Sequence, residues 1–384
     1  MNPMLGLGLL LAGLLTVEGL LKPDFSPKNH GTWSQAQIRN GKKAAQELAR
    51  QNTEFGFKLY RKLASSVPNK NIFFSPLGIG TVFSMLSLGA EDSTLAEIKQ
   101  GFNFRNMPEK ELHEGFHYLI HMLDQKRQDL ELGLRNALYI DRELRPKKKF
   151  MTDIKNIYNA DTVLTSFQNL ENTRKQINEY IPRWQHQFDP KETKEDDFIL
   201  NGNRTVKVPM MFHMGGYKVG HDDQLSCSIL EMPYHGDITA IFILPDVGQM
   251  KHVEEALRME TFARWSKLTK QRVVDVSLPK FSISGTYDLK KTLPRMGITK
   301  VFQEHGDLTK ISPDQSLKVG EAVHKAQLQM DEKGSEAAAG SAAQALPMEM
   351  PLTIKINRAF LLIIKQDSTS TVLFMGKIAD PTKK

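Results

Sequence analysis

The chain has 384 residues, of which 40% are hydrophobic and 25% are charged, and its formal net charge is +7. This composition excludes disorder as the global state, because enough apolar residues are present for the core of one large domain or two ordinary ones. The basic balance allows an acidic polyanion such as a glycosaminoglycan as a partner but specifies none. The single cysteine, Cys227, excludes an internal disulfide, and its surroundings favour a small residue within a strand.

Residues 1–20 have the features of a secretory signal peptide. Almost every side chain from Met4 to Val17 is apolar, and Glu18-Gly19-Leu20 places small or neutral residues before a cleavage site. The apolar stretch is too short to span a membrane, and no later segment resembles a transmembrane helix. We therefore predict a secreted, extracellular protein in which the sequon at Asn203 is a possible N-glycosylation site.

Hydrophobic periodicity along the rest of the chain predicts an α+β domain. Residues 21–41 are polar and aperiodic, so we expect a flexible N-terminal arm. Apolar residues at helical spacing predict helices over residues 42–63, 79–88, 109–123 and 147–158. Later apolar runs predict strands over residues 239–244, 272–278, 352–356 and 360–364. Because no internal repeat or long linker divides the chain, we expect residues 42–384 to form one domain.

The segment from Gly334 to Pro347 consists almost entirely of small residues. Small residues occupy every second position, namely Ser335, Ala337, Ala339, Ser341, Ala343 and Ala345. The larger Glu336, Gln344 and Leu346 have the other parity. Because alternate side chains of a strand face opposite sides, this segment suits insertion into a packed sheet. A flexible linker is the alternative, but it gives no reason for the parity.

Several motifs resemble the serpin family and follow the family's order. Residues 332–339 resemble the serpin hinge, with Glu332, Gly334, Ser335, Ala337, Ala338 and Ala339 at hinge positions. Residues 71–76 and 85–90 resemble the shutter region, with Ser75, Pro76 and His324 at shutter positions. The resemblance, which is strongest to the antitrypsin-like clade, implies helices packed on a large, mostly antiparallel central sheet. It also implies two further sheets and an exposed reactive-centre loop at residues 334–353.

The resemblance further implies inhibition of a serine protease by a suicide-substrate mechanism. The protease cuts the exposed loop, the freed hinge inserts into the central sheet, and the acylated protease is dragged away and distorted. Counting from Gly334 as the family does places the cut between Met348 and Glu349. Methionine is long and apolar, so it suits the hydrophobic S1 pocket of a chymotrypsin-like protease, and the resemblance narrows the target to a tissue kallikrein. No catalytic residue, cofactor or metal is expected in the chain itself.

One departure from the family concerns the central sheet. After Ile181 the chain continues directly with Pro182, where serpins complete a helix and then run a long apolar strand. We therefore expect the central sheet to lack a strand, as the product of a splice form, a faulty gene model or a true isoform. Gly78 and Gly80 replace hydroxyl or small chiral residues of the shutter, so the hydrogen bonds around His324 are expected to be incomplete. Two alternatives stay open: a non-inhibitory serpin that acts as a binding module, and a shortened chain that is cut as a substrate.

A zinc-protease motif is the main rival interpretation. Residues 113–117 match the pattern His-Glu-x-x-His, which on a helix places two histidines on one face. No continuation with a further ligand follows, and His121 extends the pair to a row of three at a spacing of four. We therefore interpret His113, His117 and His121 as an exposed stripe rather than as a metal site.

A basic cluster offers a possible heparin-binding site. Its members are Arg142, Arg145, Lys147, Lys148 and Lys149. Such side chains bind sulfate groups through charge-assisted hydrogen bonds, although a solvated start of a helix is the commoner explanation of such a run. We expect a monomer without a nucleic-acid partner.

Overall fold

The computed structural model describes residues 7–10, 33–124, 137–141, 145–165, 184–200, 204–234, 236–304, 306–312, 317–332 and 351–383. The helices are α1 (Gln35–Ser66), α2 (Pro76–Ser87), α3 (Asp92–Gly101), α4 (Glu109–Asp124), α5 (Lys148–Tyr158), α6 (Met250–Glu255), α7 (Met259–Leu268) and α8 (Leu289–Thr292). Three 3-10 turns accompany them, η3 (Pro190–Glu192), η4 (Leu293–Met296) and η5 (Lys300–Phe302). No helix within these ranges is long and apolar enough to cross a membrane.

The strands form three sheets. They are β1 (Leu7–Leu10), β2 (Ile72–Phe74), β3 (Ala137–Asp141), β4 (Asp161–Thr165), β5 (Lys194–Ile199), β6 (Thr205–Asp222), β7 (Cys227–Pro233), β8 (Ile238–Pro245), β9 (Lys270–Pro279), β10 (Phe281–Asp288), β11 (Val319–Met330), β12 (Leu352–Lys355), β13 (Phe360–Gln366) and β14 (Val372–Ile378). A nine-stranded sheet has the order β12-β9-β6-β7-β8-β13-β14-β2, with β5 paired to β6. A three-stranded sheet has the order β1-β11-β10, and β3 pairs with β4 alone.

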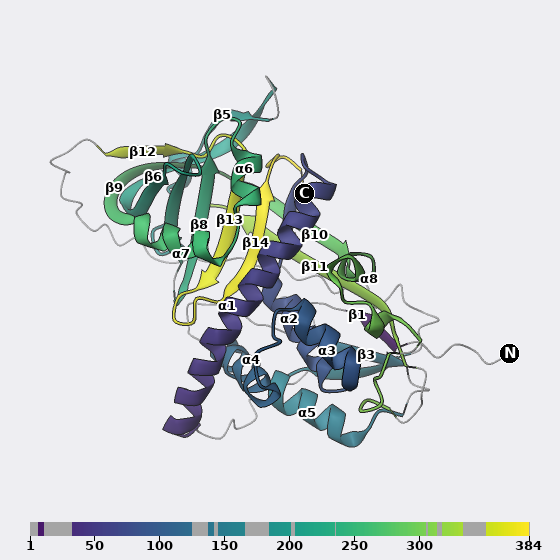
Figure 1. Cartoon of the computed structure of the whole chain (residues 1–384). Coiled ribbons are helices and arrows are strands. Elements are labelled where there is room, and N and C mark those ends of the chain that lie inside the picture. Colours follow the sequence, from purple (N-terminus) through teal and green to yellow (C-terminus); the bar gives the residue numbers. More distant parts are fainter. Residues whose placement is uncertain are drawn as a thin grey trace.

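The nine-stranded sheet lies at one end of the molecule and helices α3, α4 and α5 lie at the other, and the long helix α1 runs from one end to the other (Figure 1). Between them, α2 is buried on every side, as expected for a helix that is apolar all round. Its position beside β14 places the start of α2 near the junction of the two larger sheets. The shutter residues therefore lie close to the centre of the molecule.

The helices and strands predicted from periodicity are present, with one correction at the N-terminal arm. Helix α1 begins at Gln35 rather than near Lys42, so residues 35–41 are helical and not part of a flexible arm. The cause is a capping box. The backbone N–H of Gln37 donates to the Ser34 hydroxyl at 3.2 Å, and the backbone N–H of Ser34 donates to the Gln37 side chain at 2.9 Å.

The sheet expected to lack a strand has three strands among the described residues. Strand β11 pairs with β10 on one side in antiparallel register. On its other side, among the described strands, β11 pairs only with β1, a four-residue parallel strand that comes from the predicted signal peptide. Strands β3 and β4 are hydrogen-bonded to each other and not to β11. Within the described residues, no strand from the chain after Ile181 takes the place beside β11.

Candidate functional site

The base of the expected loop is fixed by a buried carboxylate. Glu332 lies just after β11 and is 7% exposed. One carboxylate oxygen accepts from the Lys280 ammonium at 2.7 Å, and the other accepts from the Thr193 hydroxyl at 2.9 Å. Burial opposes ionisation of this carboxyl, but the hydrogen bond from Lys280 and the others lower the pKa of Glu332 overall. The carboxylate therefore ties the end of β11 to the link between β9 and β10.

Trp184 holds the backbone of Asp331, the residue before Glu332. Its indole N–H donates to the backbone carbonyl of Asp331 at 3.2 Å, and its ring stacks on Tyr234 at a centroid distance of 4.2 Å. Trp184 is 1% exposed and is the first described residue after the expected deletion. The sequence motifs singled out neither Trp184 nor Lys280, although a lone tryptophan in a polar segment is a signal of burial.

The far end of the loop is anchored to β9, the strand that ends just before Lys280. Strand β12 pairs with β9 in parallel, with Leu352 opposite Val274. The chain between Glu332 and β12 thus begins and ends on elements that contact one another. The hinge positions Gly334, Ser335, Ala337, Ala338 and Ala339 and the expected reactive bond Met348–Glu349 lie outside the described residues.

The three shutter residues lie together. Ser75 caps α2, since the backbone N–H of Gly78 donates to its hydroxyl at 2.9 Å, and Pro76 occupies the first turn of the helix. The Ser75 hydroxyl donates to the carbonyl of Leu373 in β14 at 2.6 Å. The backbone N–H of Ser75 donates to Nε2 of His324 at 2.9 Å. These bonds connect α2, β14 and β11.

The ring of His324 is buried and bonds through one of its two nitrogens in the described part of the chain. His324 is 1% exposed, and its Nδ1 has no hydrogen-bond partner among the described residues. Burial lowers its pKa to about 3, so the ring is neutral and Nδ1 carries the proton. A buried N–H donor without an acceptor is unfavourable by about 1–3 kcal/mol. This cost falls on β11, the strand that carries His324.

Gly80 lies against another polar group without a partner. A Cβ atom at this position would come 2.2 Å from Oδ1 of Asn52, whose amide oxygen and nitrogen are both buried without hydrogen bonds in the described part of the chain. While the Asn52 side chain keeps this orientation, only glycine fits at position 80.

Comparison with known proteins supplies the family. The family model described as Serpin (serine protease inhibitor) matches residues 50–183 and 182–381. Serpin A12 of Homo sapiens is 56% identical over 414 residues, which cover 100% of this chain and 100% of the relative. Alpha-1-antiproteinase S of Cavia porcellus is 37% identical and covers 98% of each chain. The chain belongs to the serpin family.

Solved serpin structures have the same fold. Human thyroxine-binding globulin aligns with a TM-score of 0.80 and 34% identity over 88% of this chain and 100% of that one. Human glycosylated kallistatin aligns with a TM-score of 0.79 and 36% identity over 89% of this chain and 100% of that one.

The comparisons also place the deletion that separates this serpin from its relatives. The serpin match is divided into two pieces that meet at residues 182–183, directly after Ile181. The alignment with human Serpin A12 runs over 414 positions, whereas this chain has 384 residues. Residues present in that relative are therefore missing here, and the interrupted match locates the loss where the strand beside β11 was expected.

The histidine row of this serpin is not an exposed stripe. His113 is 7% exposed, and its Nδ1 lies 2.5 Å from the hydroxyl of Tyr158. Burial lowers the pKa of His113 to about 4. His117 and His121 are half-buried and contact the ring of Trp33. The prediction of exposure was wrong for His113 because α4 packs this face against α5. Among the described residues, no cluster of side chains that could hold a metal ion was found.

The basic cluster lies at the exposed start of α5. Arg145, Lys147, Lys148 and Lys149 are exposed, and Lys149 pairs with Asp153 at 2.6 Å. Arg142 and the sequon residue Asn203 lie outside the described residues. Heparin binding here and glycosylation stay predictions.

Cys227 lies within a strand, as predicted. It is fully buried in β7, and burial raises the pKa of its thiol to about 12.

Proposed function

We propose that this serpin is a secreted suicide substrate for a chymotrypsin-like serine protease of the tissue kallikrein type, cut between Met348 and Glu349. The supporting observation is the anchoring of both loop ends, by Glu332 on Lys280 and by β12 on β9. The chain between these two anchors is the expected reactive-centre loop. Family membership supplies the inhibitor class.

The composition of the loop supports insertion after cleavage. Small residues at every second position from Ser335 to Ala345 allow the segment to enter a packed sheet without displacing core side chains. A loop that only binds a ligand has no need of this pattern. The target's serine is the nucleophile, and the serpin contributes the scissile bond.

The identity of Met348 supports the protease class. An unbranched apolar side chain fills a hydrophobic S1 pocket. In a trypsin-like pocket it leaves the aspartate at the base without a cationic partner. Removal of a signal peptide, a monomeric state and heparin binding at the α5 cluster belong to the same proposal.

A second candidate function is that of a cleavable substrate with poor inhibition. The observation that favours it is that, among the described strands, only the short β1 lies beside β11 opposite β10, and that the Nδ1 of His324 has no partner in the described part of the chain. Insertion of the hinge requires a long strand edge on each side, and β1 offers four residues. A non-inhibitory binding module is the remaining alternative.

Mixing the mature chain with chymotrypsin and with a tissue kallikrein tests the proposal. We expect cleavage after Met348 and a covalent complex that survives denaturing electrophoresis. Met348→Ala should lower the cleavage rate about tenfold or more, whereas the matched variant Met350→Ala should not. Ala339→Arg should abolish the complex and leave cleavage intact, because a charged side chain blocks insertion.

The outcomes separate the candidates. Cleavage after Met348 without a stable complex assigns the substrate role to this chain. No cleavage of the loop by either protease contradicts both roles and leaves the binding module.

A further inference from the structure

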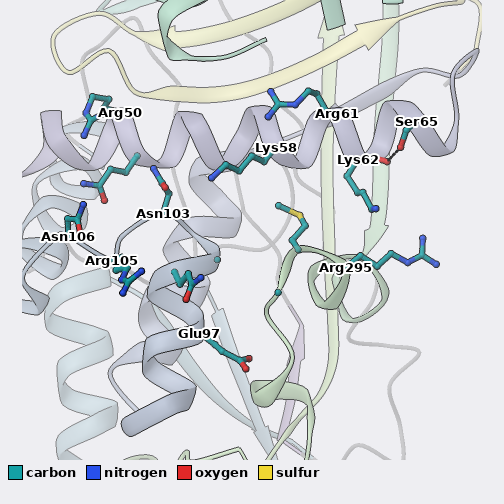
Figure 2. A pocket seen from close by; sticks show the side chains of 15 residues that line it. Arg50, Lys58, Arg61, Lys62, Ser65, Glu97, Asn103, Arg105, Asn106 and Arg295 are labelled. Carbon is teal, nitrogen blue, oxygen red and sulfur yellow. Dashed lines mark hydrogen bonds between the residues drawn. The ribbon is translucent and has the colours of Figure 1, made fainter. Parts of the chain in front are cut away.

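A polar cleft lies between α1 and α3 and extends to the turn after α3 and to η4. It has a volume of about 1190 Å³. Residues from α1, α3, the segment at 103–106 and η4 line it (Figure 2). Among the described residues lining the cleft, Met296 is the one large apolar side chain. This surface, here named the α1–α3 cleft, belongs neither to the loop anchors nor to the shutter.

Cations dominate the lining of the α1–α3 cleft. Lys58 and Lys62 extend from α1 on the side that faces Arg105 and Arg295 (Figure 2). All four of these side chains are exposed, and none has an ion-pair partner among the described residues, in contrast to Arg50, which pairs with Glu47 at 2.8 Å.

The one acidic side chain in the lining is already engaged. The Glu97 carboxylate accepts from the backbone N–H groups of Thr299 and Lys300 at 2.9 and 2.8 Å. Figure 2 shows it directed away from Lys58 and Arg105. Burial opposes its ionisation, but these backbone hydrogen bonds lower the pKa of Glu97 overall. Glu97 therefore does not neutralise the four unpaired cations.

Buried neighbours fix the position of Arg105. Phe102 and Phe104 are 0% exposed on either side of Asn103, which adopts a left-handed φ of 65° and reverses the chain after α3. This alternation packs the phenylalanines inward and holds Asn103 and Arg105 on the cleft side. The backbone that carries Asn103 and Arg105 is thus held in place before any ligand binds, which reduces the backbone entropy lost on binding.

We propose that the α1–α3 cleft binds a small anion that carries several phosphate groups. Four cations without an ion-pair partner in the described part of the chain line the cleft from three segments, together with the amide side chains of Gln100, Asn103 and Asn106. Lysine and arginine form strong charge-assisted hydrogen bonds with phosphate oxygens, and amides supply neutral donors between them. The polar lining disfavours an apolar ligand. The concave shape distinguishes this site from the open basic cluster at α5.

Inositol hexakisphosphate is the probe for the test. We expect saturable binding by titration calorimetry and a higher melting temperature of the full chain in its presence. Lys58→Ala with Arg105→Ala should weaken binding roughly tenfold or more, because two charge-assisted contacts are lost. The matched control is Arg145→Ala with Lys148→Ala, which removes the same charges from the α5 cluster and should change binding less than about threefold.

Vesicles with and without a phosphoinositide distinguish a membrane headgroup from a free ligand. Binding of the soluble probe alone supports a free ligand, and binding of both the probe and phosphoinositide vesicles, lost in the cleft variant, supports a headgroup. Equal weakening by the cleft and control variants overturns the proposal. The proposal is also overturned if neither phosphate probe binds, even where a heparin fragment binds at the cleft. Unchanged melting temperatures of the ligand-free variants show that they fold.

Discussion

His324 in β11 connects that strand to the start of α2, which carries the other two shutter residues. Its Nε2 accepts the backbone N–H of Ser75, whereas its Nδ1 faces no acceptor in the described structure. A neutral ring is required for this arrangement, because protonation of Nε2 removes the acceptor. The shutter is consequently sensitive to acid.

The sign of this pH dependence follows from the pKa. The folded-state pKa of about 3 lies below the ordinary value of 6.5, so between these values the unfolded chain binds a proton that the folded chain does not. The free energy of unfolding should therefore fall as pH drops below about 6.5, by about 2 kcal/mol from this residue at pH 5. His324→Gln should reduce the difference in urea midpoint between pH 7 and pH 5.

His252→Gln is the control for this experiment, because that histidine is exposed. It should leave the pH dependence unchanged. An equal reduction in both variants would show that the effect does not arise at the shutter.

The ion pair at the loop base makes a separate prediction. Glu332→Gln leaves the Lys280 ammonium without its anion and should lower the free energy of unfolding by about 1–2 kcal/mol. Glu304→Gln removes a similar pair with Lys318 whose carboxylate side chain is 57% exposed, and it should cost about 0–1 kcal/mol. Urea unfolding at pH 7 measures both, and a loss for Glu304→Gln as large as that for Glu332→Gln would contradict the importance of burial.

At the scale of elements, the contact between β10 and β2 holds the two larger sheets together. The backbone N–H of Phe73 in β2 donates to the Tyr287 hydroxyl of β10 at 3.0 Å. A Cβ atom at Gly285 would lie 2.0 Å from the carbonyl oxygen of Phe73, so only glycine permits this approach.

Gly285→Ala should therefore separate the strands and lower the free energy of unfolding by about 3 kcal/mol or more. Gly248→Ala is the control: this glycine has φ +84° and no neighbour within 4 Å, so the expected cost is about 1 kcal/mol of backbone strain. Melting temperature and soluble yield report the difference. Equal losses would mean that the close approach carries no special weight.

The elements themselves were largely predictable, because each depends on its own periodicity. Helix α4 and strand β13 follow the apolar spacing of their residues. The start of α1 was missed because it depends on two polar side chains, Ser34 and Gln37, rather than on an apolar pattern. The burial of His113 was missed because it depends on the tertiary packing of α4 on α5, which the periodicity of α4 alone does not reveal.

The site was predictable where a motif is continuous in sequence. Ser75 and Pro76 belong to one motif, and their place at the start of α2 follows from capping preferences. Lys280 and Trp184 lie far along the chain from the Glu332 and Asp331 that they bond to, and these contacts form only through the fold. The α1–α3 cleft likewise combines segments whose charges, read separately, are typical of solvated surfaces.

At the scale of the whole molecule, the deletion leaves β11 with an unusual neighbour. Strand β1 pairs with β11 through Leu7, Leu9 and Leu10, opposite Val319, Ala322 and Val323. These residues belong to the segment predicted to be removed on secretion. The mature chain would then present β11 as an edge, and an unpaired edge is a template for pairing with another chain.

Hydrogen exchange followed by mass spectrometry tests this arrangement. In a chain that begins at residue 21, amides of β11 that do not bond to β10 should exchange at least about tenfold faster than in the full chain, because opening no longer has to break the β1 ladder. Leu9→Pro in the full chain should have the same effect, since proline removes the backbone donor and disfavours pairing opposite Ala322. The amides that bond to β10 should stay protected in both and serve as the internal control. Uniform protection of β11 in the shortened chain would mean that another segment covers the edge, and protection that increases with protein concentration would identify that segment as part of a second copy.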